Sequence, residues 1–454
     1  MKRLRSQVGI TDDLLYEELS ISKKKNKKSA KKLIALTEIK IEEKKLLKKK
    51  PSKKNIKKSK SNIRSKSSVE LKSLKLDIEE KRENPESEKM ITNNYISKLK
   101  SLNFNIDFGP VRIRLGLCCE NNFLRAQKET VFCSRSCTLS TYRSKGKQEA
   151  IDRAMKNVKD LDKLMLWNKE HYIDVLRISS QLFPHYTNIR NIEEKDRYSL
   201  TYFEKELKRL GDLSKKLNKR LTFHPGQFNV VGSPNEQVFK STCEDLKMHA
   251  DILDMMGLDY NSIMVVHGGG TYGDKTTTIK RWITNFKRLP ESVQKRLVLE
   301  NCEKNFSVID CLEINKEIGI PVVFDNHHFN CYKSYHPDDK FEDVRTYISA
   351  CIDTWRKKGL RPKFHLSEQA KNKTYVGAHS DYIHEFPEYY LEIPKTYKVG
   401  IDIMVEAKAK EAAIFDLYMR YKDNFLSHVK NVDDERLKID RENKLALKCP
   451  SCAV

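Results

Sequence analysis

Eight short apolar runs constrain the fold of this 454-residue chain more than any other feature. Each run has the length of a β-strand, and helix-like stretches such as 147–171, 236–256, 307–318 and 410–427 lie between them. Strand and helix alternate eight times over roughly 320 residues, which predicts a (β/α)8 TIM barrel, with a doubly wound open sheet as the alternative. The runs are Arg112–Leu117, Val175–Leu182, Leu221–His224, Ile263–His267, Leu297–Glu300, Pro321–Asp325, Lys363–Leu366 and Ile401–Glu406.

A histidine or a carboxylate ends most of the later runs or lies in the loop that follows. The carboxyl ends of parallel barrel strands meet at one face, so these side chains should gather there. Imidazole and carboxylate groups together suit Zn²⁺ or Mn²⁺, and a carboxylate such as Glu300 could bridge two ions. A single histidine at a strand end is more often a core residue, so the prediction depends on the ordered set. Its members are His224, His267, Glu300, Asp325, His328, His365, His379 and Glu406.

Positive charge is concentrated at the start of the chain. Residues 1–100 contain 30 Lys or Arg against 14 Asp or Glu, in a chain whose net charge is +24. Runs such as KKKNKK and KKLLKKK cannot bury enough apolar surface to offset chain entropy, which predicts a disordered, Lys-rich N-terminal extension over 1–105. A solvated charge run is the simplest interpretation. A sequence-independent contact with DNA or RNA, or a nuclear address, is the functional one.

Eleven cysteines, an odd number, indicate a reducing compartment rather than a disulfide framework. Four of them follow the first run at a spacing that a structural zinc ion could use, and unrelated reduced thiols are the alternative. They are Cys118, Cys119, Cys133 and Cys137. Cys449 and Cys452 form a weaker candidate near the end of the chain. No apolar stretch reaches the roughly 20 residues that span a bilayer.

Several longer motifs in the same region resemble the ultraviolet damage endonuclease family. They are HPGQFN at 224–229, VVHGGGTYGDK at 265–275, IPVVFDNHH at 320–328, KFHLS at 363–367, HSDYI at 379–383 and DIMVEAKAKE at 402–411. The motifs occur in order within a domain expected to span 106–430, before a short tail at 431–454. The resemblance implies a metal-dependent (β/α)8 DNA-repair endonuclease. Such an enzyme nicks duplex DNA immediately 5′ to ultraviolet photoproducts and other distorting lesions.

The resemblance also implies roles for individual residues. The eight histidine and carboxylate side chains would be ligands for two or three divalent ions, with Mn²⁺ favoured and Zn²⁺ or Co²⁺ as alternatives. Glu300, Lys363 and Glu406 would be catalytic, Lys363 as a carboxylated lysine near the metals. Gln227 and Phe228 would probe the DNA lesion, with Phe228 in the place of a tyrosine of the relatives.

The resemblance further predicts the surroundings of the protein. Its partner would be damaged double-stranded DNA, with no membrane, and the chain would act as a monomer. Its expected location is intracellular, in the nucleus or another DNA-containing compartment, and a viral origin stays open.

Three alternatives stay open at this point. An apurinic-site endonuclease of the endonuclease IV type would cut abasic duplex in preference to dimer-containing duplex. A non-catalytic basic DNA-binding protein would keep its DNA binding after loss of metal. A sugar isomerase would share the metals at the strand ends but has no use for the basic tail or for Gln227 and Phe228.

Overall fold

The computed structural model of the chain describes residues 93, 111–371, 373–421 and 424. All of them belong to one compact unit. The predicted tails at 1–105 and 431–454, residue 93 excepted, lie outside the described residues, as do Cys449 and Cys452. Among the helices that are described, none combines the length and apolar character that a membrane crossing requires.

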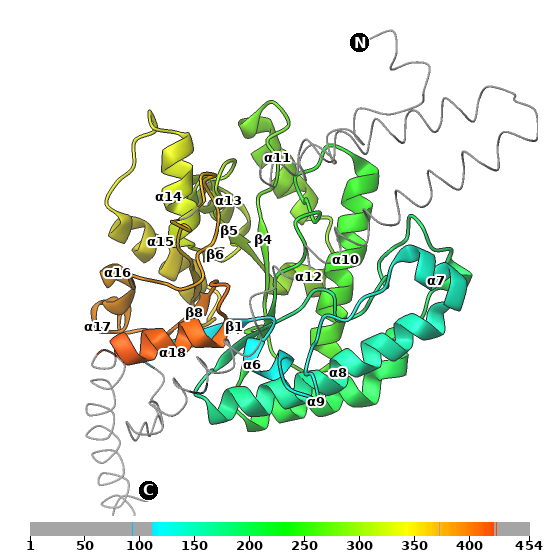
Figure 1. Cartoon of the computed structure of the whole chain (residues 1–454). Coiled ribbons are helices and arrows are strands. Elements are labelled where there is room, and N and C mark those ends of the chain that lie inside the picture. Colours follow the sequence, from blue (N-terminus) through cyan, green and yellow to red (C-terminus); the bar gives the residue numbers. More distant parts are fainter. Residues whose placement is uncertain (1–92, 94–110, 372, 422–423, 425–454) are drawn as a thin grey trace, which may run out of the picture. The chain divides into compact units, whose positions relative to one another are not determined.

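Eight parallel strands form one sheet, and each of the eight predicted runs contributes one of them. Neighbouring strands follow the order β6-β5-β4-β3-β2-β1-β8-β7, and the sheet curls into the predicted barrel rather than an open sheet (Figure 1). The strands are β1 (Ile113–Cys118), β2 (Val175–Ile178), β3 (Arg220–Phe223), β4 (Met264–His267), β5 (Leu297–Glu300), β6 (Val322–Val323), β7 (Lys363–Leu366) and β8 (Ile401–Val405).

Two strands, β2 and β6, are shorter than the sequence predicted by more than one residue. β2 ends at Ile178 rather than Leu182, because the Ser179 carbonyl accepts a hydrogen bond from Leu182 N and the chain turns there. β6 has two residues in place of the predicted five. Pro321 has no N–H group to donate to a neighbouring strand. Asp325 is already the N-cap residue of the next helix.

The seam between β6 and β7 closes the barrel with few backbone hydrogen bonds. A parallel bridge joins Asp325 to His365, and the His365 N–H donates to the Phe324 carbonyl at 3.0 Å. The Tyr390 hydroxyl contacts the carbonyl oxygens of Phe324 and His365, at 3.2 Å and 3.0 Å. A buried tyrosine side chain therefore supports a seam that a single parallel bridge joins.

Helices surround the sheet and follow the strands in the alternation that the sequence predicts. Among these helices, α8 lies beside α9, and α9 lies beside α10, on one side of the barrel (Figure 1). The α-helices are α6 (Asn122–Arg125), α7 (Leu139–Lys145), α8 (Lys147–Glu170), α9 (Glu204–Lys216), α10 (Glu236–Met255), α11 (Lys275–Phe286), α12 (Glu291–Arg296), α13 (Val308–Ile318), α14 (Asn326–Tyr335), α15 (Val344–Arg356), α16 (Glu388–Leu391), α17 (Ile393–Tyr397) and α18 (Glu411–Arg420), and two 3₁₀ turns are η1 (Glu194–Asp196) and η2 (Leu200–Phe203).

The inside of the barrel is mostly polar, whereas the main apolar core lies between the sheet and the helices. A small separate apolar cluster joins Cys118, Val175 and Met404. Gly116 lies against this cluster, and a Cβ atom at Gly116 would come within 2.9 Å of Met404 Cε. Arginine and aspartate side chains fill the interior at the amino-terminal ends of the strands, and histidine and glutamate side chains fill it at the carboxyl ends. The carboxyl ends carry the candidate site.

Candidate metal centre

The Glu300 carboxylate lies at the centre of the site, fully buried at the end of β5. Its Oε2 atom is 3.1 Å from His224 Nε2 and 3.7 Å from His267 Nε2. Its Oε1 atom is 2.8 Å from His365 Nδ1 and 3.3 Å from His328 Nδ1. Two possible ligand groups result, His224–Glu300–His365 and His267–Glu300–His328, each with atoms within 4.8 Å of one another. One carboxylate shared by two groups is the arrangement that a bridging ligand requires.

The other three predicted ligands lie at the edge of these two groups. Glu406 Oε1 is 3.2 Å from His365 Nδ1. His379 Nδ1 is 4.0 Å from Glu406 Oε2 and also contacts the Glu406 carbonyl oxygen at 3.0 Å. Asp325 Oδ1 lies 4.0 Å from His328 Nδ1. All eight predicted side chains are thus brought to one end of the barrel.

Strand register explains why these residues meet. His267 and Glu300 are direct neighbours across β4 and β5, and Asp325 bridges to His365 across the seam. Lys363 and His365 are two residues apart on β7, so their side chains point to the same side of the strand. Lys363 Nζ lies 2.6 Å from His365 Nε2, and both side chains are fully buried inside the barrel.

The surroundings favour the ionised forms of Glu300 and Glu406. Burial opposes ionisation of Glu300, but the neighbouring imidazoles, His365 first, hold the pKa of Glu300 well below its usual range. Burial likewise opposes ionisation of Glu406, and Arg177 keeps the pKa of Glu406 below its usual value. Burial lowers the pKa of His267 to about 4. Ionised carboxylates and neutral imidazoles are the forms that bind a metal ion.

Two other groups have pKa values shifted by their surroundings. Burial lowers the pKa of Lys363 to about 7, with a further decrease from the positive charge of Arg177. His328 is different: burial opposes its protonation, but the combined effect of Asp325, Glu300 and Glu303 raises the pKa of His328 well above its usual value. A metal ion bound by His328 Nδ1 would therefore have to displace a proton.

Three residues of the site were missed by the sequence analysis. Arg177 on β2 forms an ion pair with Glu406 inside the barrel. The sequence did contain a sign of this residue, because Arg177 is the single charged side chain in the apolar run VLRI. It lies two residues after Val175, so both side chains point to the same face of the strand. Asn301 exchanges hydrogen bonds with the backbone of Asp325, at 2.9 Å and 3.1 Å. Ser367 donates to the Asp325 carboxylate at 2.9 Å. Neither Asn301 nor Ser367 had a signal in a single sequence.

The predicted lesion-probing pair lies in the loop after β3, next to His224. Gln227 and Phe228 are exposed, and 62% of Phe228 is accessible to solvent. The Phe228 ring lies over Gly226, where a Cβ atom would come within 2.5 Å of the ring. The Pro225-Gly226 turn therefore presents an aromatic face at the rim of the site, and a larger residue at 226 would require the Phe228 ring to move.

The four cysteines of the predicted zinc site do not form a ligand group. Both metal-binding groups found in the described part of the chain surround Glu300 and contain no cysteine. Cys118 points into the barrel and contacts the Arg177 guanidinium. Cys133 is buried in the main core. Cys119 has a left-handed backbone with φ 65°, and its hydrogen bond with Cys118 lowers the pKa of Cys119 to about 6 despite burial.

Comparison with the sequences of known proteins shows the family of this chain. Residues 113–439 match the family model of UV-endonuclease UvdE. The chain belongs to this family. It is 37% identical over 314 residues to a UvdE relative from Acanthamoeba polyphaga mimivirus that carries the UV-damage endonuclease name, covering 68% of this chain and 92% of the relative. The UV-damage endonuclease of Schizosaccharomyces pombe is 38% identical over 321 residues, covering 69% of this chain and 51% of the relative.

Solved structures show the same fold. The crystal structure of SacUVDE superposes with a TM-score of 0.58 and 30% sequence identity, over 69% of this chain and 99% of that one. The resemblance to the ultraviolet damage endonuclease family and the (β/α)8 barrel that it implied are therefore both confirmed.

Proposed function

We propose that this UvdE family member nicks duplex DNA immediately 5′ to ultraviolet photoproducts, that is cyclobutane dimers and 6-4 photoproducts, and to other distorting lesions. The reaction is metal-assisted hydrolysis of the phosphodiester bond. The observation that carries the proposal is the buried Glu300 carboxylate, which faces four imidazoles at the mouth of a barrel of this family. An endonuclease IV-type activity at abasic sites is the alternative that the same centre allows.

The donor set fits divalent metal ions. It consists of imidazole nitrogens and carboxylate oxygens that are buried or half-buried, without a thiolate. We propose two or three ions, with Mn²⁺ favoured and Zn²⁺ or Co²⁺ as alternatives. Ions bound there would supply an activated water molecule and positive charge for the phosphate. The ligands would be the eight predicted side chains, His224, His267, Glu300, Asp325, His328, His365, His379 and Glu406.

Three side chains are proposed as catalytic. Glu300 would hold both halves of the centre together, because each ligand group includes it. Glu406 would be fixed by its ion pair with Arg177. Lys363 has a pKa of about 7, so a substantial part of it is a neutral amine at neutral pH. A neutral amine is the form that adds carbon dioxide, and we propose that Lys363 is carboxylated beside the centre.

Lesion recognition would use Gln227 and Phe228. An exposed aromatic ring at the rim of the site can enter the base stack at a damaged step. A photodimer is already poorly stacked and paired, so separating it from its neighbours requires less energy than separating normal bases. Phe228 offers the stacking face of a tyrosine without its hydroxyl.

The surroundings of the enzyme follow from its substrate. We propose that it acts as a monomer on damaged double-stranded DNA in the nucleus or another DNA-containing compartment. The viral relative is consistent with a viral source. The basic extension at 1–105 would add sequence-independent contacts with phosphates.

The test is nicking of a short duplex that carries one defined cyclobutane dimer, with Mn²⁺ or with a chelator, and with both ends of the break mapped. A Mn²⁺-dependent cut directly 5′ to the dimer, absent from undamaged duplex, is the expected result. Cleavage of an abasic duplex without cleavage at the dimer would instead support an endonuclease IV-type activity at abasic sites. Equal nicking with chelator would contradict the metal centre.

A further inference from the structure

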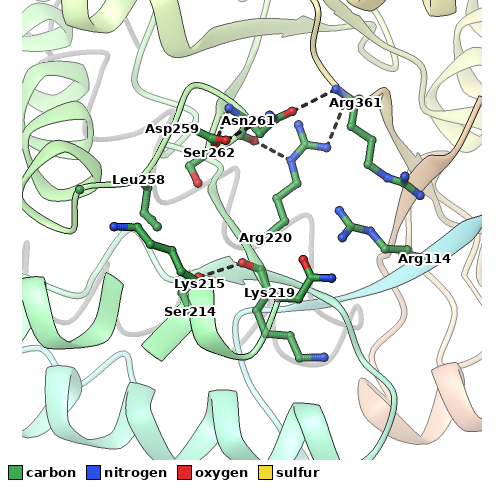
Figure 2. A pocket seen from close by; sticks show the side chains of 12 residues that line it. Arg114, Ser214, Lys215, Lys219, Arg220, Leu258, Asp259, Asn261, Ser262 and Arg361 are labelled. Carbon is green, nitrogen blue, oxygen red and sulfur yellow. Dashed lines mark hydrogen bonds between the residues drawn. The ribbon is translucent and has the colours of Figure 1, made fainter. Parts of the chain in front are cut away.

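A pocket lies at the amino-terminal ends of the strands, whereas the metal centre lies at their carboxyl ends. Figure 2 shows the side chains that line this pocket. Its volume is about 430 Å³, and it is open to solvent on one side. The loops before β3, β4 and β7 form its wall. Its basic lining residues are Arg114, Lys215, Lys219, Arg220 and Arg361.

Three of these arginines share one buried carboxylate. Arg114 pairs with Asp402 at 2.6 Å, Arg361 at 2.7 Å and Arg220 at 2.9 Å. The Asp402 side chain is fully buried, and that of Arg220 is 4% exposed. Three guanidinium groups around one carboxylate leave an excess of positive charge at the wall of the pocket. Such an excess is unfavourable unless another anion approaches.

A second group on the same side of the barrel is also rich in positive charge. Asp174 pairs with both Arg112, at 2.8 Å, and Lys219, at 2.9 Å. One acidic side chain, that of Asp259, belongs to the described lining of the pocket. Its carboxylate accepts a hydrogen bond from Asn261 N at 3.0 Å. The described wall therefore has more cations than carboxylates.

Arg220 keeps a donor without a partner. Its Nε donates to the Asn261 carbonyl at 2.6 Å, and its Nη1 donates to the Arg361 carbonyl at 2.9 Å. Its Nη2 atom is buried and has no hydrogen-bond partner. Figure 2 shows the Arg220 side chain reaching between Asn261 and Arg361, within the wall of the pocket. One guanidinium nitrogen in the wall of the pocket therefore has no hydrogen-bond acceptor from the protein, and the guanidinium carbon lies 5.7 Å from the centroid of the Trp355 ring.

The mouth of the pocket carries a further cation. Lys215 is the penultimate residue of α9 in the pocket wall, and a Cβ atom at Gly257 would lie 3.3 Å from its Nζ atom. Its one carboxylate partner in the described structure, Asp212, is exposed and 3.6 Å away. Lys216, the next residue, is exposed but does not line the pocket. These two neighbouring lysines therefore differ mainly in whether they face the pocket.

We propose that this pocket binds a small phosphorylated anion, either inorganic phosphate or the phosphate group of a mononucleotide. Planar guanidinium groups match the oxygen atoms of a phosphate, and an ammonium group at the mouth adds a point charge. The volume is within the range of small-ligand pockets. The pocket shares no lining residue with the metal centre, so we expect its ligand to be separate from the DNA strand that is cut.

The test is calorimetric titration of the full chain, in chelator, with inorganic phosphate, AMP and adenosine. Phosphate and AMP should bind, and adenosine should not, because it has no phosphate group. The charge reversal Lys215→Glu should weaken binding by at least about tenfold, since it places a negative charge at the mouth. The matched reversal Lys216→Glu should leave the dissociation constant within about twofold, because at that position only long-range, screened charge changes.

Two further measurements separate this site from other phosphate contacts. Arg361→Gln should also weaken phosphate binding, and if it does not fold, the Lys215 and Lys216 variants still decide. Both lysine variants should nick dimer-containing DNA at the wild-type rate, because neither belongs to the metal centre. Equal phosphate affinity in Lys215→Glu and Lys216→Glu, or no phosphate binding by the wild-type chain, would overturn the proposal and leave the proposed function unaffected.

Discussion

Arg177 on β2 forms an ion pair with Glu406 beyond the end of β8, although 229 positions separate the two residues in the sequence. The same guanidinium contacts the thiol of Cys118. Arg177 lies inside the barrel with 13% of its side chain exposed, and its charge also contributes to the low pKa of Lys363. One side chain therefore acts on two of the three proposed catalytic groups.

Replacement of Arg177 by Met should strongly reduce nicking. Methionine keeps the length of the side chain but removes the positive charge that pairs with the half-buried Glu406 carboxylate, which should lower the free energy of unfolding by about 3–5 kcal/mol. Arg177→Lys restores the charge and should recover part of the stability. Denaturant unfolding, metal content by mass spectrometry and nicking rates would measure the effect. Wild-type nicking by the Met variant would contradict this role.

Glu300→Gln should remove bound metal and abolish nicking while the barrel stays folded. Glutamine has nearly the same shape, but it lacks the charge that both ligand groups share. We expect the nicking rate to fall at least roughly 100-fold, with loss of one or more ions per chain. Glu313→Gln, an exposed change on α13, is the control and should behave as wild type. An unchanged metal content would show that Glu300 is not a ligand.

Asp402→Asn should destabilise the protein in a pH-dependent way. Burial opposes ionisation of Asp402, but Arg114 and Arg361 hold its pKa well below the ordinary 3.8. Because the folded-state pKa is the lower one, ionised Asp402 stabilises the fold fully above that ordinary value and progressively less as the pH falls toward the folded-state pKa. The loss should be about 3–5 kcal/mol at pH 7.

Urea unfolding between neutral pH and about pH 3 would measure this dependence, with the exposed Asp338→Asn as control. The gap between Asp402→Asn and wild type should narrow only at the acid end. A gap that stays constant over the whole range would mean that charge is not the source of the effect.

Phe228→Ala should impair recognition of the lesion without loss of metal or stability. The ring is 62% exposed, so its removal takes away little buried surface. Stacking on a base contributes about 1–3 kcal/mol, which predicts a fall in kcat/KM of roughly 5- to 150-fold on a dimer-containing duplex. Phe228→Tyr should retain activity. Tyr202→Ala removes another exposed ring, on η2, and should leave activity unchanged.

Deletion of residues 1–100 should weaken DNA binding and flatten its dependence on salt. The segment carries 30 Lys or Arg and 14 Asp or Glu, and each lost phosphate contact reduces the slope of log affinity against log salt. Metal content should not change. Fluorescence anisotropy over a range of salt concentrations would test the role of the tail, and an identical slope for both chains would refute it.

The strand ends were predictable because each follows a local apolar run and side chains alternate along a strand. Those two rules placed His267, Glu300 and His365 at one face. Arg177 and Asp402 could not be assigned in the same way. Each has a partner far away in the sequence, and a single buried charge does not reveal which strand across the barrel neutralises it.

The cysteine prediction shows where spacing fails as a guide. Cys118 ends β1, and Cys119, with its left-handed backbone, packs against the same small cluster inside the barrel. The structure places Cys118 inside the barrel and Cys133 in the core outside it. Four thiols close in sequence therefore lie on different sides of the sheet, and sequence distance alone could not indicate this.

The seam between β6 and β7 links loss of metal to loss of stability. Asp325 and His365, two proposed ligands, are the pair that bridges these strands. An ion bound by both residues would cross-link β6 and β7 at a seam that a single parallel bridge joins. Loss of that ion would stop catalysis and would also weaken the contact between β6 and β7. The metal-free enzyme should therefore begin to unfold at this seam.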